Sequence, residues 1–300
     1  MNRPMYRERV IYAGNTIEII DTYPTQFGDK VRRENRKSGK GTPEAVKQYN
    51  RELAKRKLTR LINNNFVPDD LWITLTYERD NRPQSEEAAK ALFRKFIRKL
   101  KGIYARHGLE LKAIKRTAYG ERGAVHHHLI VPQGVSSKEI TKLWREVSGA
   151  SDKARAPHYV PLYPEGEYSC LASYLVEQLS AEEGELHVRK WTCTRNIRKP
   201  IEKAPRDVYK IKWNEPIKPR KGYYVDKDSI RAGTNEVTGR PYLFYRMVKI
   251  EDGYTCRDET GRLLRGSDAA EYISRRNKQW IRENWVRISP EGEVIFNDDG

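Results

Sequence analysis

The sequence predicts an α+β fold in which helices pack on an antiparallel sheet, followed by a β-rich C-terminal extension. Apolar residues recur at helical spacing in several segments, whereas other short segments are dense in β-branched and aromatic residues, as strands are. Two of these strand segments are separated by a short glycine-containing turn, which is typical of a hairpin. Because a hairpin joins antiparallel neighbours and helices connect the other strands, a helix-covered antiparallel sheet is the expected arrangement.

Each element follows from its own residues. Val10–Thr22 has the pattern of a strand pair around Gly14 and Asn15, and Thr42 with Pro43 is typical of the N-cap and first residue of a helix. A basic loop is expected between these two elements. The other predicted strands are 71–77, 109–119, 124–131 and 158–162, the predicted helices are 85–107, 137–147 and 168–179, and the hairpin turn is 120–123.

After Pro200 the composition changes, because prolines stand among lysines and arginines as in a linker or an extended arm. Strand-like runs such as 242–250 follow, then a helix near 269–282 and a hairpin around 290–292. We therefore expect three consecutive regions. These are the strand pair, basic loop and helix at 1–66, a core domain at 67–205, and a linker with a C-terminal extension at 206–300.

The balance of charge indicates a polyanionic partner. The chain has 58 Lys and Arg against 41 Asp and Glu, a net charge of +17 and a pI near 9.7. Such a surface attracts nucleic acid, although a basic surface that is merely solvated has the same composition. The chain has no long apolar run or amphipathic anchor, so we expect no membrane partner.

The cysteines and the N-terminal residues bear on the compartment. Cys170, Cys193 and Cys256 are far apart in the sequence and form neither a CxxC pair nor a zinc pattern. Cysteines without a disulfide framework are typical of a reducing compartment. Residues 1–9 have no apolar core of the kind that a signal peptide has. We therefore expect a cytoplasmic protein.

Three consecutive histidines stand in the predicted strand Ala124–Val131. Because side chains alternate along a strand, His126 and His128 should share one face while His127 points to the other. Two imidazoles on one face, one residue apart, are able to share a metal ion. A packed or surface-exposed histidine cluster is the alternative interpretation.

Three motifs, in this order, resemble those of the HUH endonuclease superfamily. They are the threonine-bearing strand Trp72–Tyr77, the histidine strand His126–His128, and the helix Leu171–Glu177, in which Tyr174 stands where the family has its nucleophile. The segment Lys190–Ile197 is similar to the "SRNL"-type stretch that follows this helix in replication proteins of Gram-positive plasmids, phages and integrative elements.

The resemblance spans about residues 6–205 and implies a rolling-circle replication initiator on an HUH/RRM-like palm, with its nuclease core at 67–205. It implies that His126 and His128 hold a divalent metal, Mn²⁺ or Mg²⁺, and that Tyr174 attacks single-stranded or hairpin DNA at a replication origin. The products would be a 5′-phosphotyrosine link and a free 3′-OH. A host helicase and a host polymerase are further partners that the resemblance implies.

The sequence departs from the family pattern at two positions. A basic residue commonly follows the tyrosine by three positions, but Glu177 stands there, and a carboxylate disfavours a tyrosinate nearby. The stretch that often supplies a glutamate as third metal ligand has Ala118 in its place, which leaves Glu121 in the turn as the substitute ligand. Tyr168 is a second candidate for the nucleophile.

These departures leave two alternatives open. One is a catalytically weak or inactive protein that binds origin DNA. The other is a relaxase or transposase of the same superfamily. Relaxases usually add a large helicase or primase region, for which 300 residues leave no space, and small transposases of this type are usually shorter than this chain.

Overall fold

A computed structural model of the chain describes residues 6–22, 42–119, 124–162, 167–177, 191–208, 217–235, 240–250, 255–265, 268–269, 272, 286–288 and 294–296. The chain divides into two units that are not consecutive in sequence. The central unit is Asn50–Lys199, and the terminal unit combines Met1–Tyr49 with Pro200–Gly300. Antiparallel sheets and helices make up both the described core and the β-rich C-terminal region, so the α+β class predicted from the sequence is confirmed.

The central unit is built on a five-stranded antiparallel sheet. Its strands lie in the order β6 (His158–Pro161), β3 (Leu71–Thr76), β5 (Val125–Val131), β4 (Ile114–Tyr119) and β7 (Thr192–Cys193). The strands expected at 71–77, 124–131 and 158–162 are confirmed. The strand expected from Leu109 begins only at Ile114, and β7 was not anticipated because its two residues are too few to form a pattern.

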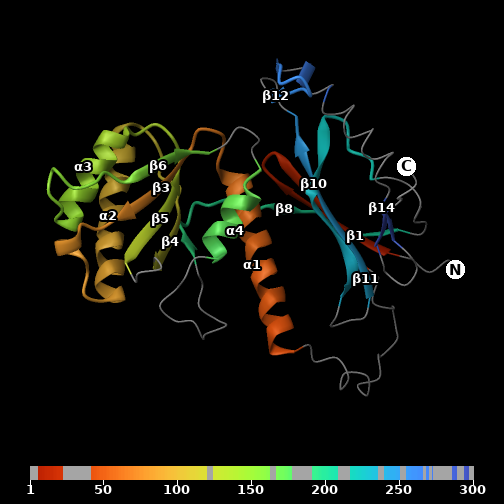
Figure 1. Cartoon of the computed structure of the whole chain (residues 1–300), viewed down its shortest axis with the longest axis horizontal. Helices are drawn as coiled ribbons and strands as arrows, with labels where there is room; N and C mark the ends of the chain where they lie inside the picture. Colours follow the sequence, from red (N-terminus) through yellow and green to blue (C-terminus); the bar gives the residue numbers. More distant parts are fainter. Residues whose placement is uncertain are drawn as a thin grey trace. The chain divides into compact units, whose positions relative to one another are not determined.

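Helices cover both faces of this sheet (Figure 1). α2 (Glu86–Arg106) and α3 (Ser137–Ser148) pack on one face, and α4 (Ser169–Glu177) with the central-unit part of α1 (Pro43–Asn65) packs on the other. The side chains of Ser85 and Ser136 cap α2 and α3 by accepting backbone N–H hydrogen bonds at 3.2 Å. A short 3-10 helix, η2 (Arg79–Asn81), follows β3.

Alternation along the strands divides the apolar side chains between two cores. Ile73, Leu75 and Leu129 point toward α2 and α3, where Phe96 and Trp144 complete the first core. The neighbouring positions point toward α1 and α4. The second core contains, among others, Ile114, Ile130, Leu58, Ile62, Leu171 and Leu175, with Trp72 packed against it. Every even-numbered side chain of β3, β4 and β5 therefore belongs to the α4 side of the sheet.

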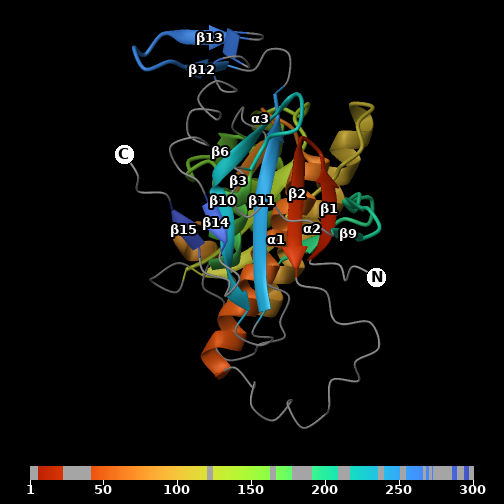
Figure 2. The same cartoon turned by 90° about the vertical axis from the view of Figure 1, so that its right-hand side faces the viewer.

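The terminal unit contains a separate six-stranded sheet, whose face is seen in Figure 2. The strand order is β10 (Tyr223–Asn235), β11 (Arg240–Lys249), β2 (Thr16–Thr22), β1 (Tyr6–Ala13) and β8 (Ile201–Glu202), and β9 (Arg206–Val208) also pairs with β1. The strand pair around Gly14 and Asn15 is confirmed. Of the two interpretations of the proline-rich stretch, the extended arm fits its described part, because β8 and β9 both hydrogen-bond to β1.

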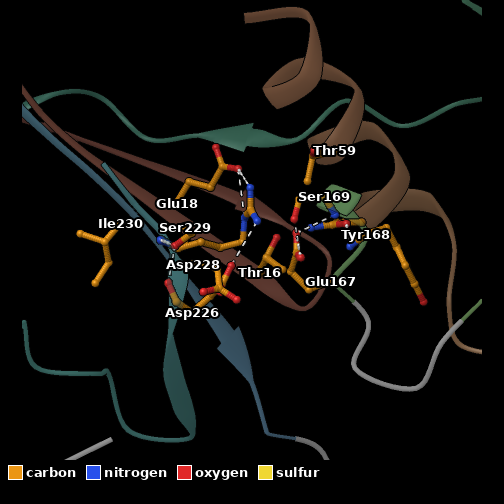
Figure 3. Close-up of polar contacts among 12 residues, drawn as sticks. Thr16, Glu18, Thr59, Glu167, Tyr168, Ser169, Asp226, Asp228, Ser229 and Ile230 are labelled. Carbon is orange, nitrogen blue, oxygen red and sulfur yellow. Dashed lines mark hydrogen bonds and ion pairs between the residues drawn. The ribbon is translucent and has the colours of Figure 1, made fainter. Parts of the chain in front are cut away.

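A buried ion pair connects the two ends of the chain inside this sheet (Figure 3). The guanidinium of Arg246 on β11 donates to Glu18 on β2 at 3.2 Å and to Asp226 on β10 at 3.4 Å. Ser229 stabilises the irregular part of β10 between Asp226 and Arg231, since its hydroxyl donates to the carbonyl of Asp226 and accepts from the backbone N–H of Arg246. Glu18 and Arg246 are almost fully buried.

The rest of the described chain consists of two small hairpins. β12 (Thr255–Arg257) pairs with β13 (Leu263–Arg265), and β14 (Val286–Ile288) pairs with β15 (Val294–Phe296), as expected around residues 290–292. Most of the helix predicted near 269–282 lies outside the described residues. None of the helices in the described ranges has both the length and the apolar composition needed to cross a bilayer.

Candidate active site

His126 and His128 lie side by side on the α4 side of the central sheet, as their alternation on β5 predicts. Their Nε2 atoms are 3.1 Å apart, and their rings are nearly perpendicular. His128 is buried and His126 is half-buried. Within the described residues, no third His, Cys, Asp or Glu joins them in a group able to hold a metal ion. Glu121, predicted as the substitute ligand, lies outside the described residues.

The other ring nitrogens decide what the two Nε2 atoms can do. Nδ1 of His126 is 3.3 Å from the carbonyl oxygen of Ala124, which only accepts, so this nitrogen carries the proton and the Nε2 of His126 has a lone pair. Nδ1 of His128 is 3.2 Å from the hydroxyl of Thr74, which can donate or accept. When Thr74 donates, the Nε2–H of His128 donates to His126; when Thr74 accepts, two lone pairs face each other and favour a cation between them. The donor set thus fits a cation, but it brings no negative charge.

His127 anchors the histidine strand from the opposite face. It is fully buried, its ring stacks on Phe93 with centroids 4.2 Å apart, and its nitrogens contact the hydroxyls of Tyr77 at 2.8 Å and Thr117 at 2.9 Å. Burial, with a smaller effect of the flanking histidines, lowers the pKa of His127 to about 3. The imidazole is therefore neutral in the folded protein at any pH at which His126 and His128 would bind a metal.

The low pKa of His127 makes stability depend on pH. The unfolded chain binds a proton near pH 6.5 and the folded protein only near pH 3, so the stabilisation is complete above pH 6.5 and is lost as the pH falls toward 3. We expect the free energy of unfolding to drop by about 2 to 3 kcal/mol between pH 7 and roughly pH 4.5 from this residue. Urea denaturation at the two pH values measures it. His127→Gln cannot titrate and should show a smaller drop; an equal drop in both proteins would contradict the assignment.

Tyr174 projects from α4 next to the histidine pair. Leu171, Ala172, Leu175 and Val176 bury the inner side of this helix, which leaves Tyr174 41% exposed. Its ring centroid is 5.4 Å from that of His128 and 5.1 Å from that of Trp72, with edge-on geometry in both contacts. Glu167 fixes the start of α4 by accepting hydrogen bonds from the backbone and hydroxyl of Ser169 (Figure 3). The structure thus brings three of the four predicted site residues together.

Tyr168, the second candidate for the nucleophile, has a different environment. It is fully buried in the core between α1 and α4, and its backbone N–H donates to the side chain of Asn63 on α1 at 3.0 Å. A hydroxyl in this position does not face solvent, so a DNA strand has access to Tyr174 but not to Tyr168.

Glu177, which departs from the family pattern, is paired with a lysine from another helix. Its carboxylate contacts Lys55 of α1 at 2.7 Å, and Lys55 also contacts Glu52. Burial opposes the charge of this amine, but the hydrogen bonds to Glu177 and Glu52 outweigh it and raise the pKa of Lys55. The repulsion expected between Glu177 and a tyrosinate is therefore reduced by a cation that is distant in sequence.

Arg116 is a residue of the site that the sequence analysis missed. It lies opposite His128 in the register of β4 and β5, and Ala118 lies opposite His126. The guanidinium is buried and contacts the carbonyl oxygen of Val176 at the end of α4 at 3.5 Å. Burial lowers the pKa of Arg116 to about 10, so it stays charged at neutral pH. Its even number in a strand that pairs with the histidine strand was the signal that could have identified it.

The comparison with known proteins reaches the same part of the chain. Residues 70–175 match the family model of the replication-associated protein ORF2. The matched range begins just before β3 and ends one residue after Tyr174, so it contains both histidines and the tyrosine. This similarity is to proteins of DNA replication and is consistent with a Rep-type replication initiator that interacts with DNA. No curated protein and no solved structure matches the chain.

Proposed function

We propose that the chain is a rolling-circle replication initiator of the HUH type that nicks single-stranded DNA at a replication origin. The observation that supports this most is the cluster of Tyr174, His126 and His128 on one side of the sheet, inside the range that matches replication-associated proteins. The substrate is single-stranded or hairpin DNA from a plasmid, phage or related element. A host helicase and a host polymerase would act on the opened strand.

In this reaction Tyr174 is the nucleophile. Its oxygen bonds to the scissile phosphorus as the P–O3′ bond breaks, the tyrosine proton is lost, and the departing 3′ oxygen takes up a proton. The result is a 5′-phosphotyrosine link and a free 3′-OH. The contacts of Tyr174 with Trp72 and His128 hold the ring beside the histidines, which favours a productive orientation of the reacting oxygen.

His126 and His128 would hold a divalent ion, Mn²⁺ or Mg²⁺, with Glu121 as a third ligand. When bound, such an ion withdraws charge from the scissile phosphate and fixes its orientation. The hydroxyl of Thr74 supports this role because, as an acceptor from Nδ1 of His128, it leaves Nε2 with a lone pair that can bind the ion. The charge of Arg116, one strand away from His128, would favour the phosphate but oppose the ion.

The second candidate function is origin binding with slow or absent nicking. Two neutral imidazoles give a hard cation a weak site, and the position opposite His126 is an alanine. A 5′-labelled single-stranded hairpin, incubated with the protein in Mn²⁺ or in EDTA, separates the two candidates. Cleavage with a covalent protein–DNA product in Mn²⁺ alone supports the nicking initiator, whereas retention of the intact hairpin in both supports the binding protein.

A glutamate at position 118 should strengthen the metal site. The side chain at 118 is on the same face as His126, so Ala118→Glu brings a charged oxygen toward the histidine pair. We expect tighter Mn²⁺ binding, by about tenfold or more, and faster nicking at low Mn²⁺. Calorimetric titration with Mn²⁺ measures the first effect.

Ala118 is buried, so circular dichroism must first show that the Ala118→Glu protein is folded. Ala118→Gln is the matched control, because it has the same length without the charge and should gain much less affinity. An unchanged Mn²⁺ affinity in a folded Ala118→Glu protein would mean that another carboxylate, such as Glu121, already serves the site.

A further inference from the structure

A groove lies along α3, on the side of the central sheet opposite to Tyr174. Its volume is about 850 Å³, within the range of ligand sites in proteins. One wall is formed by α3 with Lys138, Thr141, Lys142 and Arg145, and Tyr159 of β6 contributes to the lining. The hydroxyl of Tyr159 is fixed by contacts with Thr141 at 2.9 Å and the carbonyl oxygen of Ser137 at 3.1 Å, so this part of the groove is well defined.

The lining is cationic. Lys138 and Lys142 are exposed, and Arg145 donates to the carbonyl oxygen of Ala154, which holds the loop after α3. Of the two carboxylates in the lining, Glu146 is paired with Lys99 of α2. That hydrogen bond and charge lower the pKa of Glu146, so it is ionised and its charge is compensated. The other carboxylate is Asp152, so cationic groups exceed anionic ones at the groove.

The spacing of the cations favours a ligand with several negative charges. Lys138, Lys142 and Arg145 are at helical positions i, i+4 and i+7, which places them along one side of α3 over about 10 Å. A single phosphate of a small molecule would contact only one or two of them. A chain of phosphodiesters would contact all three.

The position of the groove connects it to the histidine pair through β6. This strand is the edge of the five-stranded sheet, and Tyr159 faces the groove. The preceding residue, His158, points to the other face, where it lies opposite Thr74, the residue that is itself opposite His128. A nucleic-acid strand that leaves the histidine pair across the sheet therefore reaches the β6 edge and, past it, the groove.

We propose that the α3 groove binds the phosphate backbone of single-stranded DNA that extends beyond the cleavage site. The proposal rests on the proposed function in taking single-stranded DNA as the ligand. It assigns the groove to the flanking strand and not to the scissile phosphate. Lys138 and Lys142 are the residues that would contact the phosphates most directly, because both are exposed and neither supports a backbone contact.

The test compares two charge-matched double variants in their binding of fluorescent oligothymidylates. Lys138→Ala/Lys142→Ala removes two cations from the groove, and Arg94→Ala/Lys101→Ala removes two exposed cations from α2, outside it. Each phosphate contact with a single strand contributes about 0.7 to the slope of log K against log salt concentration. We expect the groove variant to lower this slope by about 1.4 with long strands and to leave it unchanged with strands too short to leave the site. The control variant should have little effect at any length.

Binding is measured in EDTA, so the result does not depend on metal or on cleavage. If nicking fails but the groove variant still lowers the slope, the proposed function is wrong and the groove remains a nucleic-acid site. Equal slopes for the two variants, or an effect that is the same at every strand length, would overturn the proposal. Displacement of a long strand by inorganic phosphate or thymidine monophosphate at matched ionic strength would instead assign the groove to a small anion and would also overturn it.

Discussion

Replacing Tyr174 with phenylalanine is expected to abolish the covalent protein–DNA product. The substitution removes only the attacking oxygen, and the ring can keep its contacts with Trp72 and His128, so the fold and DNA binding should be preserved. Because the hydroxyl is the nucleophile, no adduct should form even after long incubation with Mn²⁺. Mass spectrometry of the protein after incubation with a single-stranded hairpin detects the added nucleotides and locates the peptide that carries them.

Tyr168→Phe is the matched control for this experiment. Its ring is buried in the core beneath α4, so loss of its hydroxyl should leave adduct formation intact. An adduct that persists in Tyr174→Phe and disappears in Tyr168→Phe would move the nucleophile to a residue that DNA reaches only after α4 moves. An adduct that persists in both would exclude the two tyrosines together.

The second large effect is expected from His126→Ala/His128→Ala. Removing both imidazoles removes the two converging Nε2 atoms, so Mn²⁺ binding should be lost and metal-dependent cleavage should fall on the order of a thousandfold or more. DNA binding should stay salt-sensitive, because it rests on phosphate contacts elsewhere. His127 keeps its hydrogen bonds on the opposite face, so the strand should stay in place. Calorimetry with Mn²⁺ and the hairpin cleavage assay measure the two effects.

His158→Ala serves as the control for the double variant. His158 is an exposed histidine on the same face, two strands away from His128 in the same row of the sheet. Its loss should not change the Mn²⁺ affinity. If His126→Ala/His128→Ala cleaves at the rate of the unmodified protein, the histidine pair is not the metal site and its close contact serves only packing.

The sequence was sufficient for those parts of the site that depend on local periodicity. The strand around His126 and His128, the face these residues share and the helix that carries Tyr174 follow from alternation and helical spacing alone. The same alternation would have placed Arg116 beside His128, but only once the register across the hairpin was known. A shift of one residue there would have turned Arg116 to the other face.

Contacts between distant segments were beyond the reach of the sequence. The pairing of Lys55 with Glu177 joins α1 to α4, and no local pattern relates two residues so far apart. The burial of His127 is of the same kind, because the alternation assigns it to the face opposite His126 but does not reveal that Phe93, Tyr77 and Thr117 enclose it there. The partnership of β1 with β8 and β9 likewise joins the two ends of the chain across the whole central unit.

The buried pair of Glu18 and Arg246 has a consequence for how the protein is made. A ribosome releases Glu18 early and Arg246 only after the whole central unit, so the carboxylate waits for its counterion while about three quarters of the chain is synthesised. Burial of an uncompensated carboxylate is costly, and the edge of β2 that pairs with β11 stays open until then. The terminal sheet is therefore completed last. A nascent chain interrupted between the two residues would keep an unpaired strand edge exposed to other chains.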